Sequence, residues 1–274
     1  MGPLLALASA VVYGIVDFTG GLLSRRAHFA AVTLFGQLGG LLLATAAALL
    51  LPADAVRPAD LLWGALSGIG SGAAMHFLNR GLSHGAMSVV VPVSAVTGVA
   101  LSVVCGVVLG DRPTAVAWIG IAVAVPALWL VSGGAGADDS GGVPDGLLAS
   151  AGVAVQYIAL AQAGAASGVW PVAAGRLAAV LVLLPTAVRH RRRLRLPPAR
   201  CLQSALVGAG AALGLVLYLL AAQRQLLAVT VVLASLYPAL PVILGLTLLH
   251  ERLTRKQLTG LTAAAAATIL LSLG

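Results

Sequence analysis

GDRPTAVAWIGIAVAVPALWLVS (residues 110–132) is followed 140 residues later by the related stretch HERLTRKQLTGLTAAAAATILLS (residues 250–272). The two stretches align without a gap, and the matched pairs share charge, size or hydroxyl chemistry: Asp111 with Glu251, Arg112 with Arg252, Thr114 with Thr254, Gly120 with Gly260, and Ser132 with Ser272. An offset close to half the chain length indicates that the sequence contains two similar halves.

The composition surrounding these stretches is that of a membrane protein. Of the 274 residues, 60% are hydrophobic and only 9% are charged, and the mean hydropathy is +1.04. A soluble domain carries about 25% charged residues, so a water-exposed surface is excluded over most of this chain. A membrane span needs about 20 apolar residues. Five segments longer than that contain no Asp, Glu, Lys or Arg: 27–53, 81–110, 113–137, 201–223 and 225–250.

Apolar runs and their breaks predict an all-α membrane protein with ten transmembrane helices. The expected spans are 3–24, 28–51, 60–80, 86–109, 114–132, 146–163, 169–188, 202–222, 227–249 and 256–273. A Gly- and Asp-rich linker, residues 133–145, separates a first half (1–132) from a second half (146–274). Five spans in each half mean that the second half enters the membrane upside-down, so we predict two inverted five-helix repeats.

Several other function classes lack support in the sequence. The N-terminus has no basic region before its apolar run, so it is interpreted as the first span and not as a signal peptide. Neither Cys105 nor Cys201 has a partner at ligand spacing, so no metal site and no cofactor are expected. The arginine run within residues 189–200 lies between two spans without interleaved aromatic residues, which favours a topology signal over nucleic-acid binding. The sequence contains no Walker-type loop, so it gives no indication of ATP-driven transport.

Over its whole length the sequence resembles the ten-span EamA-like group of the drug/metabolite transporter superfamily. The resemblance rests on the acidic-Arg-x-Thr signatures at 111–114 and 251–254, and on the Ser- and Pro-containing segments MSVVVPVSAVTG (87–98) and VTVVLASLYPALP (229–241). The first signature reads GDR where the family has GER, and the second begins with His250 where the family has Gly. The resemblance implies a transporter of small molecules such as amino acids, sugars, nucleotide-linked metabolites or drugs, located in the plasma or inner membrane.

Asp17 is the only acid inside a predicted span, and acids in that environment are candidate functional residues. Tyr13 shares its helix face, together with Gly14, Gly20 and Gly21. We consider two roles for Asp17. It takes part in substrate binding or proton coupling, or it is a structural carboxylate held by a neighbouring helix, for which Arg176 is a candidate partner.

Arg176 lies inside the seventh span, where the family has an arginine, and Gln37 occupies the aligned position in the first half. Because an arginine stays protonated, it needs an anionic or carbonyl partner there, either from the substrate or from the protein. His76 and Tyr157 add polarity to the third and sixth spans, and each has a structural alternative as a hydrogen-bonded packing residue.

The fourth and ninth spans carry hydroxyl groups and prolines at similar depth. The hydroxyl-bearing candidates are Ser94, Thr97, Ser235 and Tyr237, and the prolines expected to break or bend the helices are Pro92, Pro238 and Pro241. Broken helices at matching positions of two repeats indicate a binding site. We therefore expect these two spans to face each other across a transport path.

These features together predict a secondary-active transporter, an exporter of a small metabolite such as an amino acid or drug-like compound, working by alternating access, with protons as the candidate coupling ion. The alternatives are a membrane enzyme acting on a lipid or prenyl substrate, and a non-transporting assembly subunit. Loops after odd-numbered spans carry twelve Arg and Lys residues and those after even-numbered spans carry three, which places both termini outside the cytoplasm. The family resemblance implies the opposite orientation.

Overall fold

The computed structural model describes residues 2–108, 114–133, 142–222 and 236–273, and within these ranges the regular structure is helical throughout. The long helices are α1 (Gly2–Arg26), α2 (Phe29–Leu50), α3 (Pro58–His84), α4 (Met87–Val108), α5 (Ala115–Gly133), α6 (Val143–Ala161), α7 (Trp170–Arg189), α8 (Pro198–Ala222), α10 (Ala239–Leu248) and α11 (Arg255–Leu273). Two short 3₁₀ turns, η2 (Ala165–Ser167) and η3 (Arg191–Leu194), lie beside α7. The expected all-α architecture is confirmed.

Six of these helices are long and apolar enough to cross a bilayer, namely α1, α2, α3, α6, α7 and α8. Shorter apolar stretches lie in α4, α5 and α10. One boundary differs from the expectation: α6 begins at Val143, inside the segment predicted to be linker. Pro144 suits the first helical turn, where the backbone N–H has no intrahelical acceptor, and Asp145 in the same turn complements the helix dipole.

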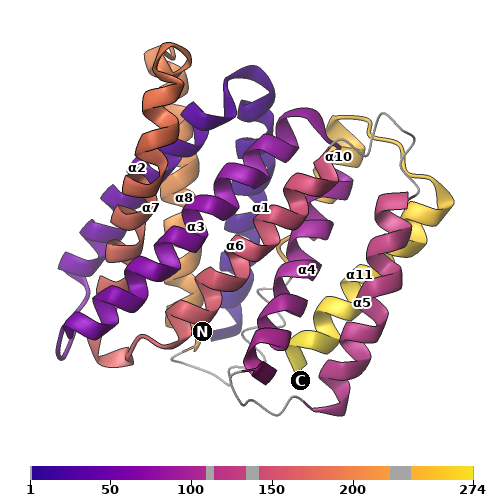
Figure 1. Ribbon diagram of the computed structural model, residues 1–274, viewed down its shortest axis with the longest axis horizontal. Coiled ribbons are helices and arrows are strands. Elements are labelled where there is room, and N and C mark those ends of the chain that lie inside the picture. Colours follow the sequence, from indigo (N-terminus) through magenta and orange to yellow (C-terminus); the bar gives the residue numbers. More distant parts are fainter. Residues whose placement is uncertain (1, 109–113, 134–141, 223–235, 274) are drawn as a thin grey trace.

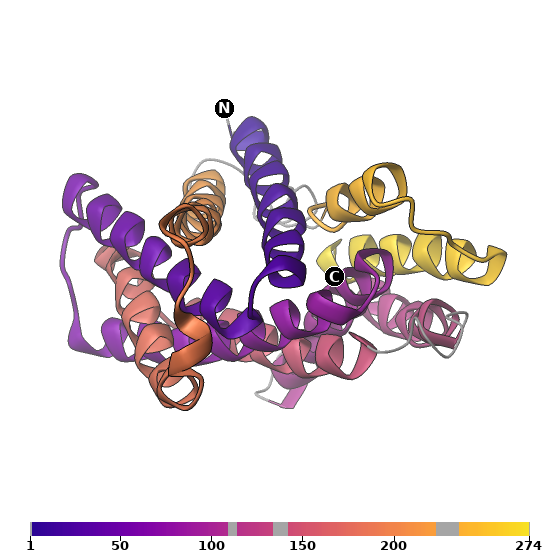
Figure 2. The ribbon, with the colours of Figure 1, turned by 90° about the horizontal axis from the view of Figure 1, so that it is seen from above.

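The helices form two groups, with both chain termini toward the same face of the molecule (Figure 1). One group contains α2, α3, α7 and α8, and in the other α5 packs along α11 beside α4. α6 joins the groups because it packs on both α3 and α4, while α1 lies against α8 and α10 (Figure 2). α5 and α11 are the last helices of the two halves, so the repeats meet there through equivalent elements.

Each half of the repeat contributes to two equivalent helix crossings, α2 with α8 and α3 with α7, and both are formed by closely packed glycines. A Cβ added to Gly208 of α8 would overlap the backbone of Gly36 in α2, and one added to Gly68 of α3 would overlap the backbone of Gly175 in α7. Gly36 and Gly175 are 139 residues apart, and Gly68 and Gly208 are 140 apart, so the two crossings are related by the sequence repeat. Small residues at a crossing let membrane helices approach closely enough for backbone packing.

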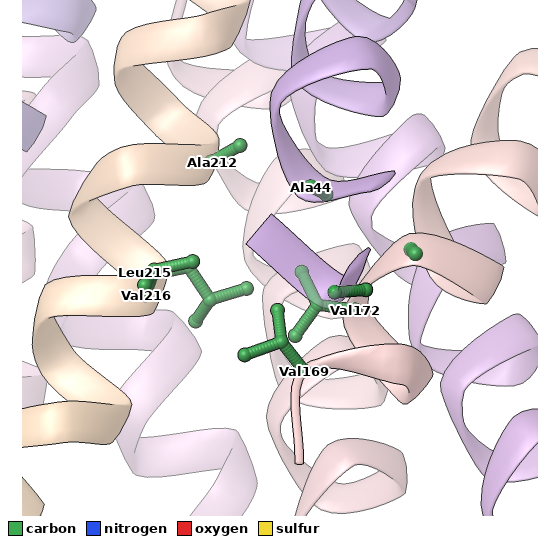
Figure 3. Packing of buried hydrophobic residues seen from close by; sticks show 8 residues of the cluster. Ala44, Val169, Val172, Ala212, Leu215 and Val216 are labelled. Atoms are coloured by element: carbon green, nitrogen blue, oxygen red, sulfur yellow. The ribbon is translucent and has the colours of Figure 1, made fainter. Parts of the chain in front are cut away.

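The α3–α7 crossing extends over three turns with four-residue spacing. Gly64, Gly68 and Gly72 of α3 face Pro171, Gly175 and Ala179 of α7, respectively. Beside it, a cluster of buried aliphatic side chains joins the end of α2, the start of α7 and the second half of α8; its labelled members are Ala44, Val169, Val172, Ala212, Leu215 and Val216 (Figure 3). Packing of this kind holds α2, α7 and α8 as one unit.

Alanine substitutions on the two sides of one crossing should behave differently. We expect Gly208→Ala to lower the free energy of unfolding by about 1–3 kcal/mol, because its Cβ has no space beside Gly36. Gly36→Ala is the matched control, since its Cβ would meet the carbonyl oxygen of Ser204 at 3.5 Å, an ordinary contact. Thermal unfolding of the two purified variants measures the difference. Equal unfolding temperatures would contradict the assigned crossing.

Candidate functional site

A buried guanidinium marks the centre of the helix bundle. Arg176 of α7 is 5% exposed, and its Nη1 donates a hydrogen bond of 3.0 Å to Oε1 of Gln37 in α2. The aliphatic and Nε part of Arg176 lies beside Gly40, where a Cβ would come within 3.4–3.5 Å. The residues that the sequence repeat aligns therefore contact each other, because α2 and α7 pack together.

Tyr13 and Asp17 of α1 face the same region. Tyr13 lies within electrostatic range of both Arg176 and Asp17, and its ring packs 6.2 Å from that of Tyr237. Asp17 is 8% exposed. No salt bridge joins it to Arg176 although both residues are described, so the ion pair considered as the structural role of Asp17 does not form in this structure.

The glycines on the Asp17 face let other helices approach α1. A Cβ at Gly14 would come within 2.6 Å of the Leu240 Cβ, and one at Gly21 would come within 2.8 Å of the terminal methyl of Met87. Close approach on this face brings α10 and α4 to the helix that carries the buried acid. The carboxyl group is thereby held among helices of both halves and away from lipid.

Two polar residues of α3, Asn79 and His76, have different neighbours. The Asn79 amide donates a hydrogen bond of 3.0 Å to the Thr33 hydroxyl of α2, inside the bundle. His76 packs edge-to-face on Phe29 with ring centroids 5.1 Å apart, and its buried Nδ1 has no hydrogen-bond partner among the described residues. The structure thus gives Asn79 a polar partner and His76 an aromatic one.

Ser94 and Thr97 of α4 are inside the protein. Ser94 is 4% exposed, and the buried Thr97 hydroxyl has no hydrogen-bond partner within the described ranges. The helix break expected at Pro92 is not found, because α4 continues through it. Pro92 is the sixth residue of α4, so it removes one intrahelical hydrogen bond, the one to the carbonyl oxygen of Ser88, without ending the helix.

The ninth span is described only from residue 236. A turn at 236–238 precedes α10, with Pro238 as its N-cap and Pro241 buried in its first turn. The expected break within the ninth span stays a prediction, because residues 223–235 lie outside the described ranges. Ser235 lies outside the described residues, as does the side chain of Tyr157 on α6. The described part of α10 does contact α4, through Leu244 packed with Val90 and Val91.

Little space remains around Arg176 in this conformation. The cavity lined by Gln37, Arg176, Thr33 and Asn79, among others, has a volume of about 10 Å³. One water molecule needs about 10–15 Å³ on this measure. A substrate can therefore reach the guanidinium only when the surrounding helices separate.

Glu251 joins three segments at the face opposite the termini. Its carboxylate accepts hydrogen bonds from the backbone N–H groups of Met87 and Ser88 at 3.0 Å each, and forms a salt bridge of 3.1 Å with Arg25. Arg25 also donates to the carbonyl oxygens of Leu82 and Gly85. We call this group of contacts the Glu251 clasp. It connects the end of α1, the start of α4 and the α10–α11 loop.

The threonine of each signature caps the helix that follows it. The Thr254 hydroxyl accepts from the N–H of Gln257 at 3.2 Å, and the Gln257 side chain accepts from the N–H of Thr254 at 2.9 Å, which is a capping box for α11. The Thr114 hydroxyl accepts from the N–H of Ala117 at the start of α5. Both signatures can be recognised in the sequence, but the contacts of Glu251 were not predicted from it. The position of Glu251 directly after the ninth span is the sequence feature that points to such a contact.

The clasp makes stability depend on pH in a definite direction. Burial opposes ionisation of Glu251, but the N–H groups of Ser88 and Met87 and the guanidinium of Arg25 outweigh it and hold the pKa of the carboxyl below its ordinary 4.5. A lowered folded-state pKa adds stability that is complete above the unfolded-state pKa and is lost as pH falls through the folded-state pKa.

We expect Glu251→Gln to lower the unfolding temperature at neutral pH and to approach the wild-type value as pH falls below about 4.5. Thermal unfolding in detergent is measured for variant and wild type from neutral to acidic pH. The difference between their unfolding temperatures reports the effect of this carboxyl group apart from the other acids. Asp54→Asn, in an exposed loop, is the control for a general effect of removing one acid. A difference that stays constant across the pH range would contradict the clasp.

Comparison with known proteins agrees with this geometry. The EamA-like transporter family matches residues 1–133 and again residues 142–273, so the family pattern occurs twice and covers nearly the whole chain. A solved structure described only as the crystal structure of a protein is similar over 98% of this chain and 95% of its own, with a TM-score of 0.58 and 14% identity, which supports the fold alone. No curated protein matches.

The doubled family match has the same period as the repeated glycine crossings and the repeated threonine caps. Sequence and structure thus agree on two equivalent halves in a multi-pass membrane protein. The chain belongs to the EamA-like transporter family.

Proposed function

We propose that this protein is a secondary-active transporter that exports a small metabolite, such as an amino acid or a drug-like compound, by alternating access between its two inverted repeats. Family membership makes it a membrane transporter. The finer proposal rests on one observation: Arg176 and Asp17 carry opposite formal charges, lie buried on different helices near Tyr13, and form no salt bridge with each other.

Arg176 is suited to bind an anionic group of the substrate. A buried charge is costly in a membrane unless it has a partner, and within the described residues the Arg176 guanidinium donates a hydrogen bond to the neutral Gln37. A substrate carboxylate or phosphate would supply the missing negative charge with bidentate geometry. Tyr13 lies within electrostatic range of Arg176, and its ring lies 6.2 Å from that of Tyr237, so we propose that both tyrosines contact the remainder of the substrate.

Asp17 is suited to couple transport to protons. It is buried on α1, where Gly14 and Gly21 on the same helix face make close contacts with α10 and α4, so we infer that its protonation state changes the energy of bringing those helices together. A buried carboxylate favours a conformation that admits water or a cation, and the protonated acid favours the closed one. Proton binding would thereby bias two arrangements of the same helices.

The conformation described here is closed at the Glu251 face. The clasp and the packing of Leu244 against α4 hold α1, α4 and α10 together there. Access from that face requires the clasp to open. We propose that Ser94, Thr97, Ser235 and Tyr237 then line the path between the fourth and ninth spans, with His76 and Tyr157 as further lining candidates.

The enzyme alternative has no observation in its favour. The described residues hold no group of three His, Cys, Asp or Glu side chains placed to bind a metal ion. EamA-family members are transporters. An assembly subunit would have no need for an unpaired buried acid and base, so the transport proposal accounts for more of the structure.

Substitution of Asp17 tests the coupling role. A screen of metabolites by thermal stabilisation identifies a substrate, and its accumulation in proteoliposomes under a pH gradient is then measured. We expect Asp17→Asn to insert and fold with wild-type thermal stability but to lose most concentrative, pH-dependent transport. Asp54→Asn, which changes an exposed acid in the same way, should transport normally.

The same assay can overturn the proposal. Normal accumulation with an unchanged pH profile in Asp17→Asn would make Asp17 structural. A loss of thermal stability in Asp17→Asn, with Asp17→Glu equally inactive and unstable, would have the same meaning. An absence of accumulation by the wild-type protein for every stabilising compound would reject the transport proposal itself.

Orientation is tested by labelling from outside the cell. The face of the Glu251 clasp carries most of the basic residues, so we propose that it is cytoplasmic in the plasma or inner membrane and that both termini are outside. A cysteine at Arg192, in η3, should then resist a membrane-impermeant thiol reagent until the membrane is permeabilised. Labelling in intact cells would reverse the orientation.

A further inference from the structure

A groove on the outside of the bundle runs between α1 and α8. It has a volume of about 490 Å³, within the range of small-molecule sites, and residues of these two helices line it. Its walls are aliphatic and include Val12, Ile15 and Leu22 of α1 and Leu206 of α8. This groove is separate from the small polar cavity around Arg176.

Apart from Arg26 and Gln203 at one end, the lining residues leave no polar side chain free for a ligand. The single hydroxyl in the wall, that of Thr19, donates to the carbonyl oxygen of Ile15 in its own helix at 2.7 Å, so the methyl group remains for contact. Ile15 is 47% exposed and Leu206 61% exposed on spans that face the bilayer. An acyl chain is the occupant that matches such a surface in a membrane.

One end of the groove is basic. Arg26, the last residue of α1, and Gln203 of α8 line this end. The Arg200 guanidinium reaches it as well, because its Nη1 donates to the Arg26 carbonyl oxygen at 3.0 Å. The positive end of the α8 dipole lies at the same level, since α8 begins at Pro198.

The described acids Asp145 and Glu251, at this end of the molecule, already form salt bridges. Among the described residues the salt bridges are Arg25 with Glu251, Arg80 with Asp145, and His84 with Asp145. Neither Arg26 nor Arg200 is paired with an acid in that set. Arg26 therefore lines the end of an apolar groove, with the Arg200 guanidinium bound to its backbone, and neither arginine has an acidic partner in the described part of the chain.

We propose that the α1–α8 groove binds one anionic phospholipid, with an acyl chain along the groove and the phosphate at Arg26, Gln203 and Arg200. The charge arrangement favours an anionic lipid over a zwitterionic one, because an arginine near the membrane surface is attracted to the net negative charge of an anionic lipid. The choline of phosphatidylcholine would place a third positive charge there. The lipid fills the outer side of the contact between α1, which carries Asp17, and α8.

Native mass spectrometry of the delipidated full-length protein, combined with thermal unfolding, tests this site. The probes are dioleoyl phosphatidylglycerol and dioleoyl phosphatidylcholine at equal concentration. We expect one phosphatidylglycerol molecule to be retained and to raise the unfolding temperature, with phosphatidylcholine giving neither effect. Arg26→Gln should abolish both effects, whereas Arg255→Gln, an exposed arginine at the start of α11, should preserve them.

Further arms separate the headgroup from the chain. If Arg26→Gln proves unstable, Gln203→Leu serves as a second headgroup variant. We expect it to weaken retention of phosphatidylglycerol. Leu206→Trp fills the groove and should release the lipid while leaving both arginines in place. Glycerol phosphate, which has no acyl chain, should not stabilise the protein.

Each opposite result overturns the proposal. Equal retention of both phospholipids would remove the anionic preference. If Arg26→Gln and Arg255→Gln lost phosphatidylglycerol to the same extent, the lipid would be held by diffuse attraction to the basic face of the protein. Unchanged retention in Leu206→Trp would place the lipid elsewhere, and stabilisation by glycerol phosphate alone would identify a free-phosphate site.

Discussion

The hydrogen bond between Arg176 and Gln37 is the contact around which the bundle is arranged. Arginine cannot lose its proton in a protein, so a guanidinium on a membrane-spanning helix must be given a polar partner and kept from lipid. Gln37 provides the partner at 3.0 Å, and Gly40 leaves room for the rest of the side chain. A neutral amide satisfies the hydrogen bond without cancelling the charge, so the guanidinium can still attract an anion.

Close helix packing makes this arrangement possible. The α2–α8 and α3–α7 crossings bring backbones together at Gly36–Gly208 and Gly68–Gly175, on either side of the α2–α7 contact that carries Gln37 and Arg176. Lipid provides no hydrophobic drive for helix association, so stability comes from such packing and from interhelical hydrogen bonds. The inverted repeat supplies both crossings from one pattern and places the buried charge between them.

The sequence predicted the fold and much of the polar centre. The alignment of Gln37 with Arg176 came from the repeat offset, and the structure shows that these two residues also contact each other. The ion pair between Asp17 and Arg176 could not be judged from sequence, because spacing fixes the face of a helix but not which neighbour that face meets. Pro92 illustrates another limit, since a proline near a helix start does not interrupt it. The Glu251 clasp depends on three chain segments that are distant in sequence, and only the folded arrangement shows that they meet.

Alternating access is the central claim, and distances across the two helix groups test it most directly. One spin-label pair at Ala199 and Lys256 reports the clasp face, and a second pair at Leu50 and Thr114 reports the opposite face; all four residues are exposed. Pulsed electron resonance would compare each pair in the wild-type background and in Glu251→Gln, where the clasp is weakened. The account predicts a longer distance at the clasp face together with a shorter one at the opposite face. Distances that stay unchanged, or that lengthen at both faces together, would contradict it.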